Sequence, residues 1–326
     1  MIDVINNSQG LQFDYELDFY DRRFLDCWRR QSVVFLEKAG AQVDLLFHNC
    51  LPSTDEIFSE HILNQKPKYA FPTPSVGDEG LALIGWRQRT QCYAQFKEAL
   101  SDIKIHLTKV PFVVVMGSVF YLPHCPEHRS EHLNHSIVLV RPTGEDSWDV
   151  VDDDEASILK RYSYQERYID DYFNNNGCRL IRYFEPVVGG SCDHALAVEK
   201  CADHVFAYTD TYRMFSDIEA IVCAPYESMA VKTRKLHEAF SIFSGSRSLF
   251  SRFVKSVLGD LSSAAVLEVI ARESMVIKYT MAKASVTGRI NMKTLVVRCE
   301  KLIALEQQAI NSLKLKMVTP SYACAK

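Results

Sequence analysis

Catalysis by a thiol nucleophile requires a cysteine, a base and a residue that orients the base. Cys27, His135 and Asp152 could fill these roles, and they occur in that order along the chain. A cysteine thiolate can attack an acyl carbonyl, a histidine can move the proton, and a carboxylate can hold the imidazole in one tautomer. The sequence therefore predicts Cys27 as the nucleophile, His135 as the base and Asp152 as the orienting residue.

The local sequence separates Cys27 from most of the ten cysteines of the chain. The apolar spacing of residues 21–39 predicts a helix that stops at Gly40. If Asp26 caps the regular part of this helix, Cys27 lies in the first turn, where unpaired N–H groups and the helix dipole favour a thiolate. Cys125 is the one rival, and the others are expected to be mostly buried packing residues. For Cys27 itself, an ordinary buried thiol is the alternative.

His135 and Asp152 are both predicted to lie at the ends of strands. The apolar run 136–140 follows the histidine, and the run 147–151 precedes the aspartate. If the two strands pair in antiparallel fashion, Asp152 comes close to His135. An ordinary acidic turn over 152–154 is the alternative for the aspartate.

Four histidines within twelve residues, with a cysteine among them, leave a second interpretation open. Imidazole and thiolate are the ligands that zinc prefers, so this segment could hold a metal ion. The candidate ligands are His124, Cys125, His128, His132 and His135. No matched ligand pair recurs elsewhere to complete a structural site, and we therefore expect neither a metal nor a protein-bound cofactor.

The elements that must position these residues mix strands and helices. Short, β-branched apolar runs predict buried strands at 110–116, 136–140, 147–151 and 180–184. Residues 80–100 predict a short apolar segment followed by a helix. This pattern indicates the α+β class.

A second region of different character follows the segment 185–191, which is the best candidate for a linker. Residues 193–316 have a helical pattern, with breaks expected near Pro225, Gly245, Gly259 and Gly288. We therefore expect two domains, a mixed domain over 1–186 and a helical bundle over 187–326.

Charge and composition exclude several classes of protein. The net charge of −4 argues against a general nucleic-acid binder. Residues 187–326 carry 18 Lys and Arg against 13 Asp and Glu, a net charge of +5, which leaves −9 for residues 1–186. The helical half could therefore offer a mildly basic surface to an acidic partner. Residues 1–7 lack the blocks of a signal peptide, and the apolar run 110–123 is too short to span a bilayer, so we expect a cytoplasmic protein without a membrane segment.

Several segments resemble the N-terminal domain family of butirosin biosynthesis protein H, which is papain-like. The order of Cys27, His135 and Asp152 is also that of papain-like enzymes. The segments that carry the resemblance are 113–123, 132–140 and 150–152, together with Asp26-Cys27-Trp28 at the place of the family's nucleophile motif. The chain departs from the usual family pattern at Asp26, Ser118 and Arg141-Pro142.

The resemblance implies a papain-like cysteine-protease fold with an appended all-helical C-terminal domain. It also implies an acyltransferase of natural-product biosynthesis, in which Cys27 takes an acyl group from a carrier-protein thioester and passes it to an amine. The partners would be an acyl or peptidyl carrier protein, which brings its own phosphopantetheine arm, and an amine acceptor. Two alternatives remain open: a peptidase, amidase or thioesterase that uses the same triad, and a non-catalytic scaffold that binds a carrier protein or a synthetase.

Overall fold

The computed structural model describes residues 10–20 and 23–318. The N-terminal residues 1–7, the expected helix start at Asp21, and Cys324 lie outside the described residues. Among the helices that the structure describes, none combines the length and the apolar character that crossing a membrane would require.

The chain forms two compact units, and each is built from separate pieces of sequence. The first comprises Met1–Arg22, Asp26–Val43 and Ile84–Ser191, and the second comprises Arg23–Leu25, Asp44–Leu83 and Cys192–Lys326. The division at 186/187 stays a prediction, but the segment Asp44–Leu83 joins the second unit although the sequence placed it in the first domain.

The first unit contains one seven-stranded sheet, in which the described strand pairs are antiparallel. The strand order is β1-β6-β5-β4-β3-β7-β2. The strands are β1 (Leu11–Gln12), β2 (Trp86–Cys92), β3 (Val113–Ser118), β4 (Asn134–Pro142), β5 (Ser147–Asp153), β6 (Leu159–Gln165) and β7 (Leu180–Pro186). The α+β class is confirmed, and the four predicted runs overlap β3, β4, β5 and β7. The prediction missed the edge strand β2 because it is mostly polar and exposed, without apolar alternation.

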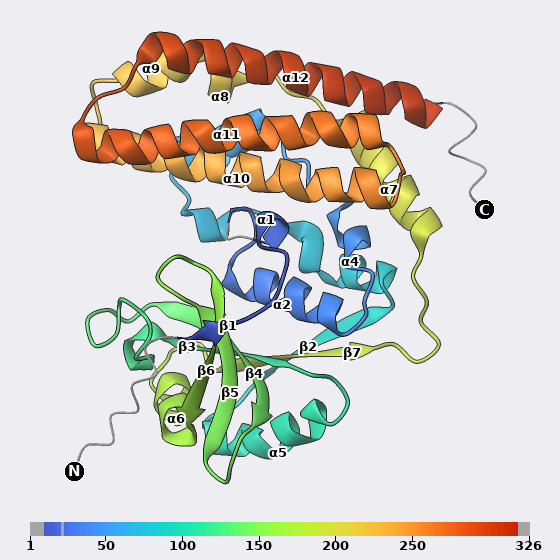
Figure 1. The fold of residues 1–326 in the computed structure, drawn as a ribbon, viewed down its shortest axis with the longest axis vertical. Helices are drawn as coiled ribbons and strands as arrows, with labels where there is room; N and C mark the ends of the chain where they lie inside the picture. The colour runs from blue at the N-terminus through green and yellow to red at the C-terminus, as the bar shows by residue number, and fades with distance from the viewer. Residues whose placement is uncertain (1–9, 21–22, 319–326) are drawn as a thin grey trace. The chain divides into compact units, whose positions relative to one another are not determined.

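Helices cover both faces of this sheet (Figure 1). The helices of the unit are α1 (Leu17–Tyr20), α2 (Cys27–Lys38), α5 (Phe96–Leu107) and α6 (Glu166–Asn174), with a short 3₁₀ turn η5 (Val119–Tyr121) after β3. Helices α5 and α6 bury apolar residues in one core together with alternate residues of β3, β4 and β5. Helix α2 lies over β3 and β4 on the opposite face. The sheet is therefore packed against helices on both of its faces.

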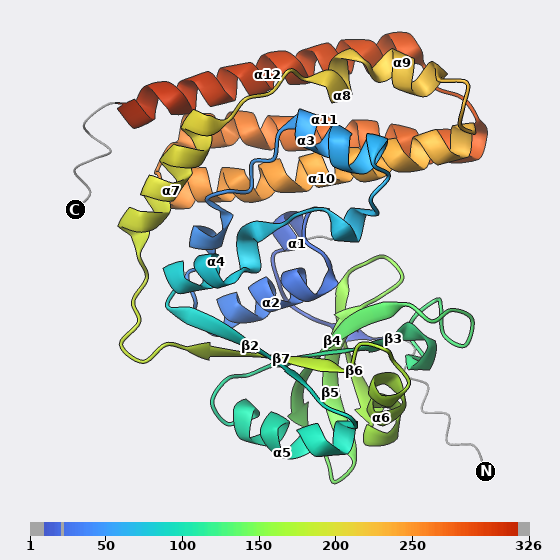
Figure 2. The same cartoon turned by 180° about the vertical axis from the view of Figure 1, so that it is seen from behind.

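The second unit is helical, and its three longest helices lie side by side (Figure 2). Those are α10 (Met229–Ser256), α11 (Leu261–Thr287) and α12 (Met292–Val318), and the remaining elements are η1 (Val43–Phe47), α3 (Thr54–Ile57), the π-helix η2 (Phe58–Leu63), η3 (Lys68–Ala70), η4 (Pro74–Val76), α4 (Asp78–Leu83), α7 (His194–Ala207), α8 (Arg213–Ser216) and α9 (Ile218–Cys223). Val43, the first residue of η1, belongs to the first unit, and the rest of η1 belongs to the second. The helical pattern predicted for this region is confirmed.

The breaks predicted near Gly259 and Gly288 are confirmed, and both glycines have a positive φ of 66°. The break predicted at Gly245 is wrong, because this glycine lies inside α10. A Cβ there would lie 2.6 Å from the backbone nitrogen of Phe24 and 2.6 Å from Cβ of Arg23. A glycine is needed at this position because two chain segments lie so close together that a Cβ does not fit between them.

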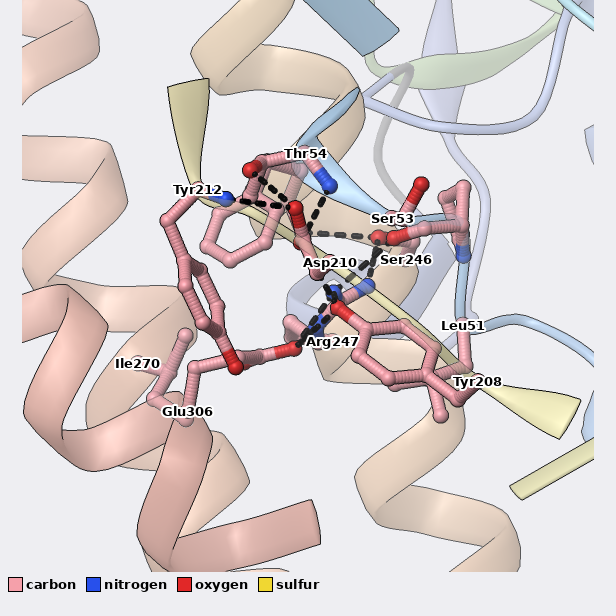
Figure 3. A network of polar contacts seen from close by, with 12 residues as sticks. Leu51, Ser53, Thr54, Tyr208, Asp210, Tyr212, Ser246, Arg247, Ile270 and Glu306 are labelled. Atoms are coloured by element: carbon pink, nitrogen blue, oxygen red, sulfur yellow. Dashed lines mark hydrogen bonds and ion pairs between the residues drawn. The ribbon is translucent and has the colours of Figure 1, made fainter. Parts of the chain in front are cut away.

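A buried polar network explains why segment 44–83 joins the helices (Figure 3). Arg247 donates to Glu306 from Nε at 2.8 Å and to a backbone carbonyl of the segment at 2.9 Å. The backbone N–H and the hydroxyl of Thr54 donate to Asp210 at 2.6 and 2.8 Å. These contacts join residues far apart in sequence, so the sequence pattern alone did not reveal them.

Candidate active site

Cys27 is the first residue of α2, as predicted from the cap. The side chain of Asp26 accepts a hydrogen bond from the backbone N–H of Arg29 at 3.0 Å. The helix therefore begins at residue 27, and the expected range 21–39 was too long. Cys27 is half-buried, and the N–H groups and the dipole of this helix end favour a negatively charged sulfur.

His135 is the second residue of β4 and lies opposite Gly117 of β3. The hydroxyl of Tyr172 lies 2.6 Å from the carbonyl oxygen of His135 and 3.0 Å from that of Val115, so its proton is shared between them. A side chain at position 117 would meet the ring of Tyr172 at 2.4 Å. The glycine thus allows Tyr172 to hold the backbone that carries the histidine.

The structure brings the three predicted residues together. His135 Nε2 lies 2.7 Å from Asp152 Oδ1, and both side chains are almost fully buried. The Cys27 thiol is hydrogen-bonded to the His135 side chain. The imidazole therefore has the carboxylate at Nε2 and the thiol as a further side-chain partner.

The opposite charges of His135 and Asp152 stabilise each other and offset the cost of burying them. Burial lowers the pKa of His135, but the charge and hydrogen bond of Asp152, together with the Cys27 thiol, raise it to about 10. Burial raises the pKa of Asp152, but His135 and His124 lower it to about 2. At neutral pH the carboxylate is thus ionised and the imidazole protonated, and an imidazolium beside the thiol favours the thiolate.

Gln31 also holds Asp152, and sequence analysis did not find it. Its Nε2 donates to Asp152 Oδ1 at 3.1 Å and to the carbonyl oxygen of Ser136 at 2.9 Å. The hydroxyl of Ser136 in turn donates to Gln31 Oε1 at 2.7 Å. Gln31 lies four residues after Cys27, so both face the same side of α2. That spacing is the signal that could have identified it.

The other oxygen of Asp152 faces a second histidine. His124 Nε2 lies 2.9 Å from Asp152 Oδ2, and its Nδ1 lies 2.5 Å from the hydroxyl of Tyr164. The sulfur of Cys125 lies 3.6 Å from the same His124 Nε2. A relay needs the thiol and the carboxylate on different ring nitrogens. Cys125 and Asp152 both lie at Nε2 of His124, an arrangement that does not suit such a relay.

A half-buried cation lies near the start of α2. The guanidinium carbon of Arg182, on β7, lies 4.2 Å from the ring centroid of Trp28. Burial lowers the pKa of Arg182, and the charges of Asp26 and Cys27 act in the opposite direction. Its Nε and Nη1 are buried and make no hydrogen bond to any described residue. The guanidinium thus adds positive charge close to Cys27.

The histidine-rich segment does not gather into one site. His132 stacks on Phe120 with ring centroids 4.1 Å apart and contacts the Ser118 hydroxyl at 3.2 Å. Among the described residues, two groups have metal-binding donors close together: His124 with Cys125 and Asp152, and His135 with Asp152 and Asp153. His128 and His132 belong to neither group.

The remaining cysteines differ from the expectation that most are buried. Of the nine described cysteines only Cys50, Cys201 and Cys299 are buried, and none of the nine forms a disulfide bond. Burial raises the pKa of Cys50 to about 12 and that of Cys299 to about 12, so these thiols are poor nucleophiles at neutral pH.

Comparison with known proteins supplies one informative relative. No model of a known protein family matches the chain. The chain is 30% identical over 135 residues to the ribostamycin:4-(γ-L-glutamylamino)-(S)-2-hydroxybutanoyl-[BtrI acyl-carrier protein] 4-(γ-L-glutamylamino)-(S)-2-hydroxybutanoate transferase of Niallia circulans. The match covers 41% of this chain and 45% of that protein, so it spans less than half of the relative's length. The resemblance to the butirosin biosynthesis protein H family is thereby confirmed.

Proposed function

We propose that this protein, like the transferase from Niallia circulans to which it is similar, moves an acyl group from a carrier-protein thioester to an amine. The acyl group would be held on Cys27 between the two steps. The observation that carries this proposal is the ring of His135, which has Asp152 at Nε2 and the Cys27 thiol as its other side-chain partner. The domain that holds the triad would be papain-like, with the cysteine at a helix start and the histidine and aspartate on neighbouring strands.

In the first step the Cys27 thiolate attacks the thioester carbon of the acyl donor. The carbon–sulfur bond to the phosphopantetheine arm of the carrier protein then breaks. The leaving thiolate takes the proton of the His135 imidazolium, so the products are acyl-Cys27, neutral His135 and the free carrier thiol. The backbone N–H of Cys27 lies at the helix end and can stabilise the oxyanion of the tetrahedral intermediate.

In the second step the amine attacks the acyl-Cys27 carbonyl. Neutral His135 takes the amine proton, an amide bond forms, and the Cys27 thiolate leaves. The ion pair of Cys27 and His135 is thus restored. Asp152 keeps its charge throughout and stabilises the imidazolium whenever it forms. No group besides the phosphopantetheine arm of the carrier protein is needed for this chemistry.

Intact-protein mass spectrometry tests the proposal directly. The protein is mixed with carrier proteins loaded with several acyl groups, including the 4-(γ-L-glutamylamino)-2-hydroxybutanoyl group that the relative's name specifies. We expect an acyl adduct on Cys27, which disappears when an acceptor amine such as ribostamycin is added. Cys27→Ala should form neither adduct nor product, and Cys92→Ala, at an exposed cysteine of β2, should form both.

Two results would decide against parts of the mechanism. If Cys27→Ala accumulates the same adduct and product as the wild type, Cys27 is not the nucleophile. If the adduct forms but decays at the same rate with and without amine, water is the acceptor and the protein is a thioesterase.

A further inference from the structure

We propose that His124 Nε2, Cys125 Sγ and Asp152 Oδ2 form a binding site for a divalent metal ion of the zinc type, directly behind the triad. These three donor atoms lie within 4.8 Å of one another. The Asp152 carboxylate is the only group that this site shares with the triad as described above, and it offers a different oxygen to each.

The distances between the donor atoms suit a tetrahedral ion. With Zn–N and Zn–O bonds of about 2.0–2.1 Å and a Zn–S bond of about 2.3 Å, nitrogen and sulfur lie about 3.5 Å apart, and nitrogen and oxygen about 3.3 Å apart. In the structure His124 Nε2 lies 3.6 Å from Cys125 Sγ and 2.9 Å from Asp152 Oδ2. The first separation already fits, and the second must open by about 0.4 Å.

The convergence of the donors on one nitrogen distinguishes this cluster from a proton relay. His124 Nε2 faces both Cys125 Sγ and Asp152 Oδ2. In a metal site the three ligand atoms likewise surround one point, which the ion occupies. On the other side of the ring, Nδ1 faces the Tyr164 hydroxyl. With an ion at Nε2 the ring proton lies on Nδ1, and the Tyr164 oxygen can accept it because a hydroxyl both donates and accepts.

The surroundings of the ligands are those of a metal site. Tyr164 contacts Nδ1 of His124 at 2.5 Å, and such a partner on the second nitrogen orients a metal-bound imidazole. The ring of Tyr162 stacks on His124 with centroids 4.0 Å apart. The side chains of His124 and Asp152 are fully buried, and Cys125 is half-buried.

Charge balance favours an ion in this buried place. The Cys125 thiolate and the Asp152 carboxylate would bring two negative charges to a divalent ion, although the carboxylate also faces the His135 imidazole through its other oxygen. Binding releases one proton, from the Cys125 thiol. Three protein ligands leave the fourth position of a tetrahedral ion open.

The second cluster of donors is not equivalent. Asp153 forms an ion pair with the buried guanidinium of Arg30, so its charge is already balanced. His135 uses Nε2 for Oδ1 of Asp152 and interacts with Cys27. An ion at the second cluster would therefore have to break the ion pair of Asp153 with Arg30 as well as the contact of His135 with Asp152.

An ion at this site would bear on the reaction of the triad, and this consequence alone rests on the proposed function. An ion at Oδ2 requires the 2.9 Å separation of His124 Nε2 and Asp152 Oδ2 to increase, which shifts the carboxylate that contacts His135. We therefore expect zinc to inhibit acyl transfer.

The site is tested by Co²⁺ titration of chelator-treated protein that carries Cys27→Ala. This variant removes the other thiol near the triad, and it cannot perform the proposed reaction. We expect one Co²⁺ per chain and a thiolate-to-cobalt charge-transfer band in the near ultraviolet, with Zn²⁺ displacing the Co²⁺. Adding Cys125→Ser should abolish the band and weaken binding by at least about 10–100-fold. Tyr164→Phe should keep the band and weaken binding by about 10-fold.

Cys92→Ser in the same background is the matched control and should bind as the parent does. Circular dichroism shows whether each variant is folded. A titration without the charge-transfer band, or a band that survives Cys125→Ser, overturns the proposal. Since the parent protein lacks Cys27, either outcome leaves the acyl-transfer mechanism standing. Conversely, failure of acyl transfer in the wild type has no effect on this titration.

Discussion

Replacing Asp152 with asparagine removes the charge that keeps His135 protonated and leaves a side chain of nearly the same shape. The pKa of His135 stands at about 10 against an ordinary value of 6.5. At 1.36 kcal/mol per pKa unit this difference corresponds to about 5 kcal/mol in favour of the imidazolium. The charge and hydrogen bond of Asp152 are the largest contributions that raise the value. Without them, burial returns the pKa of His135 to its ordinary value or below.

The consequence is measurable as the reactivity of Cys27 toward iodoacetamide. In the wild type the imidazolium persists through neutral pH and pairs with the thiolate, so alkylation is already fast at pH 6. In Asp152→Asn we expect alkylation at pH 6 to be slower by at least about tenfold, because a smaller fraction of molecules holds the ion pair. Near pH 9.5 the two proteins should converge, since the thiol then loses its proton directly to solvent. Rates are measured by mass spectrometry from pH 4.5 to 9.5 with EDTA present.

Asp149→Asn is the matched control. Asp149 is also a buried carboxylate of β5, but its partners are Arg141 and Arg161 rather than His135. This variant should keep the wild-type profile. If Asp152→Asn keeps that profile too, or if Asp149→Asn shifts it equally, the carboxylate does not control the ion pair and the reasoning fails.

Three further substitutions test the packing and the support of the site. Glu306→Gln should lower the free energy of unfolding by about 3–5 kcal/mol, since it leaves the fully buried Arg247 charge without its counter-ion; urea unfolding measures this, and a combined variant with Arg247→Met should recover part of the loss. Gly245→Ala should cost about 1–2 kcal/mol in the same assay, because the added methyl group meets backbone at 2.6 Å and overpacking outweighs the gain in helix propensity; an unchanged midpoint would contradict this. Gln31→Leu removes one donor from the buried Asp152 carboxylate and should lower the free energy of unfolding by about 1.5–3 kcal/mol, as the loss of a hydrogen bond to a charged group predicts; an unchanged urea midpoint would contradict this.

The sequence determined those features that depend on neighbours along the chain. Asp26 predicts the start of α2 because an N-cap acts within three residues, and Cys27 is placed by that start. The apolar runs predict β3, β4 and β5 because a strand buried on both faces needs continuous apolar residues. Two adjacent antiparallel strands then suffice to bring Asp152 toward His135.

The tertiary structure alone decided which distant side chains converge. His124 reaches Asp152 from a loop, and no spacing along the chain specifies that meeting. The spacing from Cys27 to Gln31 places both on one side of α2, but only the fold shows that Gln31 contacts Asp152. A glycine within a helical pattern predicts a break, but at Gly245 a neighbouring segment lies so close that only a hydrogen fits. Side-chain convergence and close packing are properties of three-dimensional distance, whereas periodicity and capping are properties of sequence distance. The sequence therefore indicated Cys27, His135 and Asp152 as a candidate set, and the fold alone showed which side chains hold them.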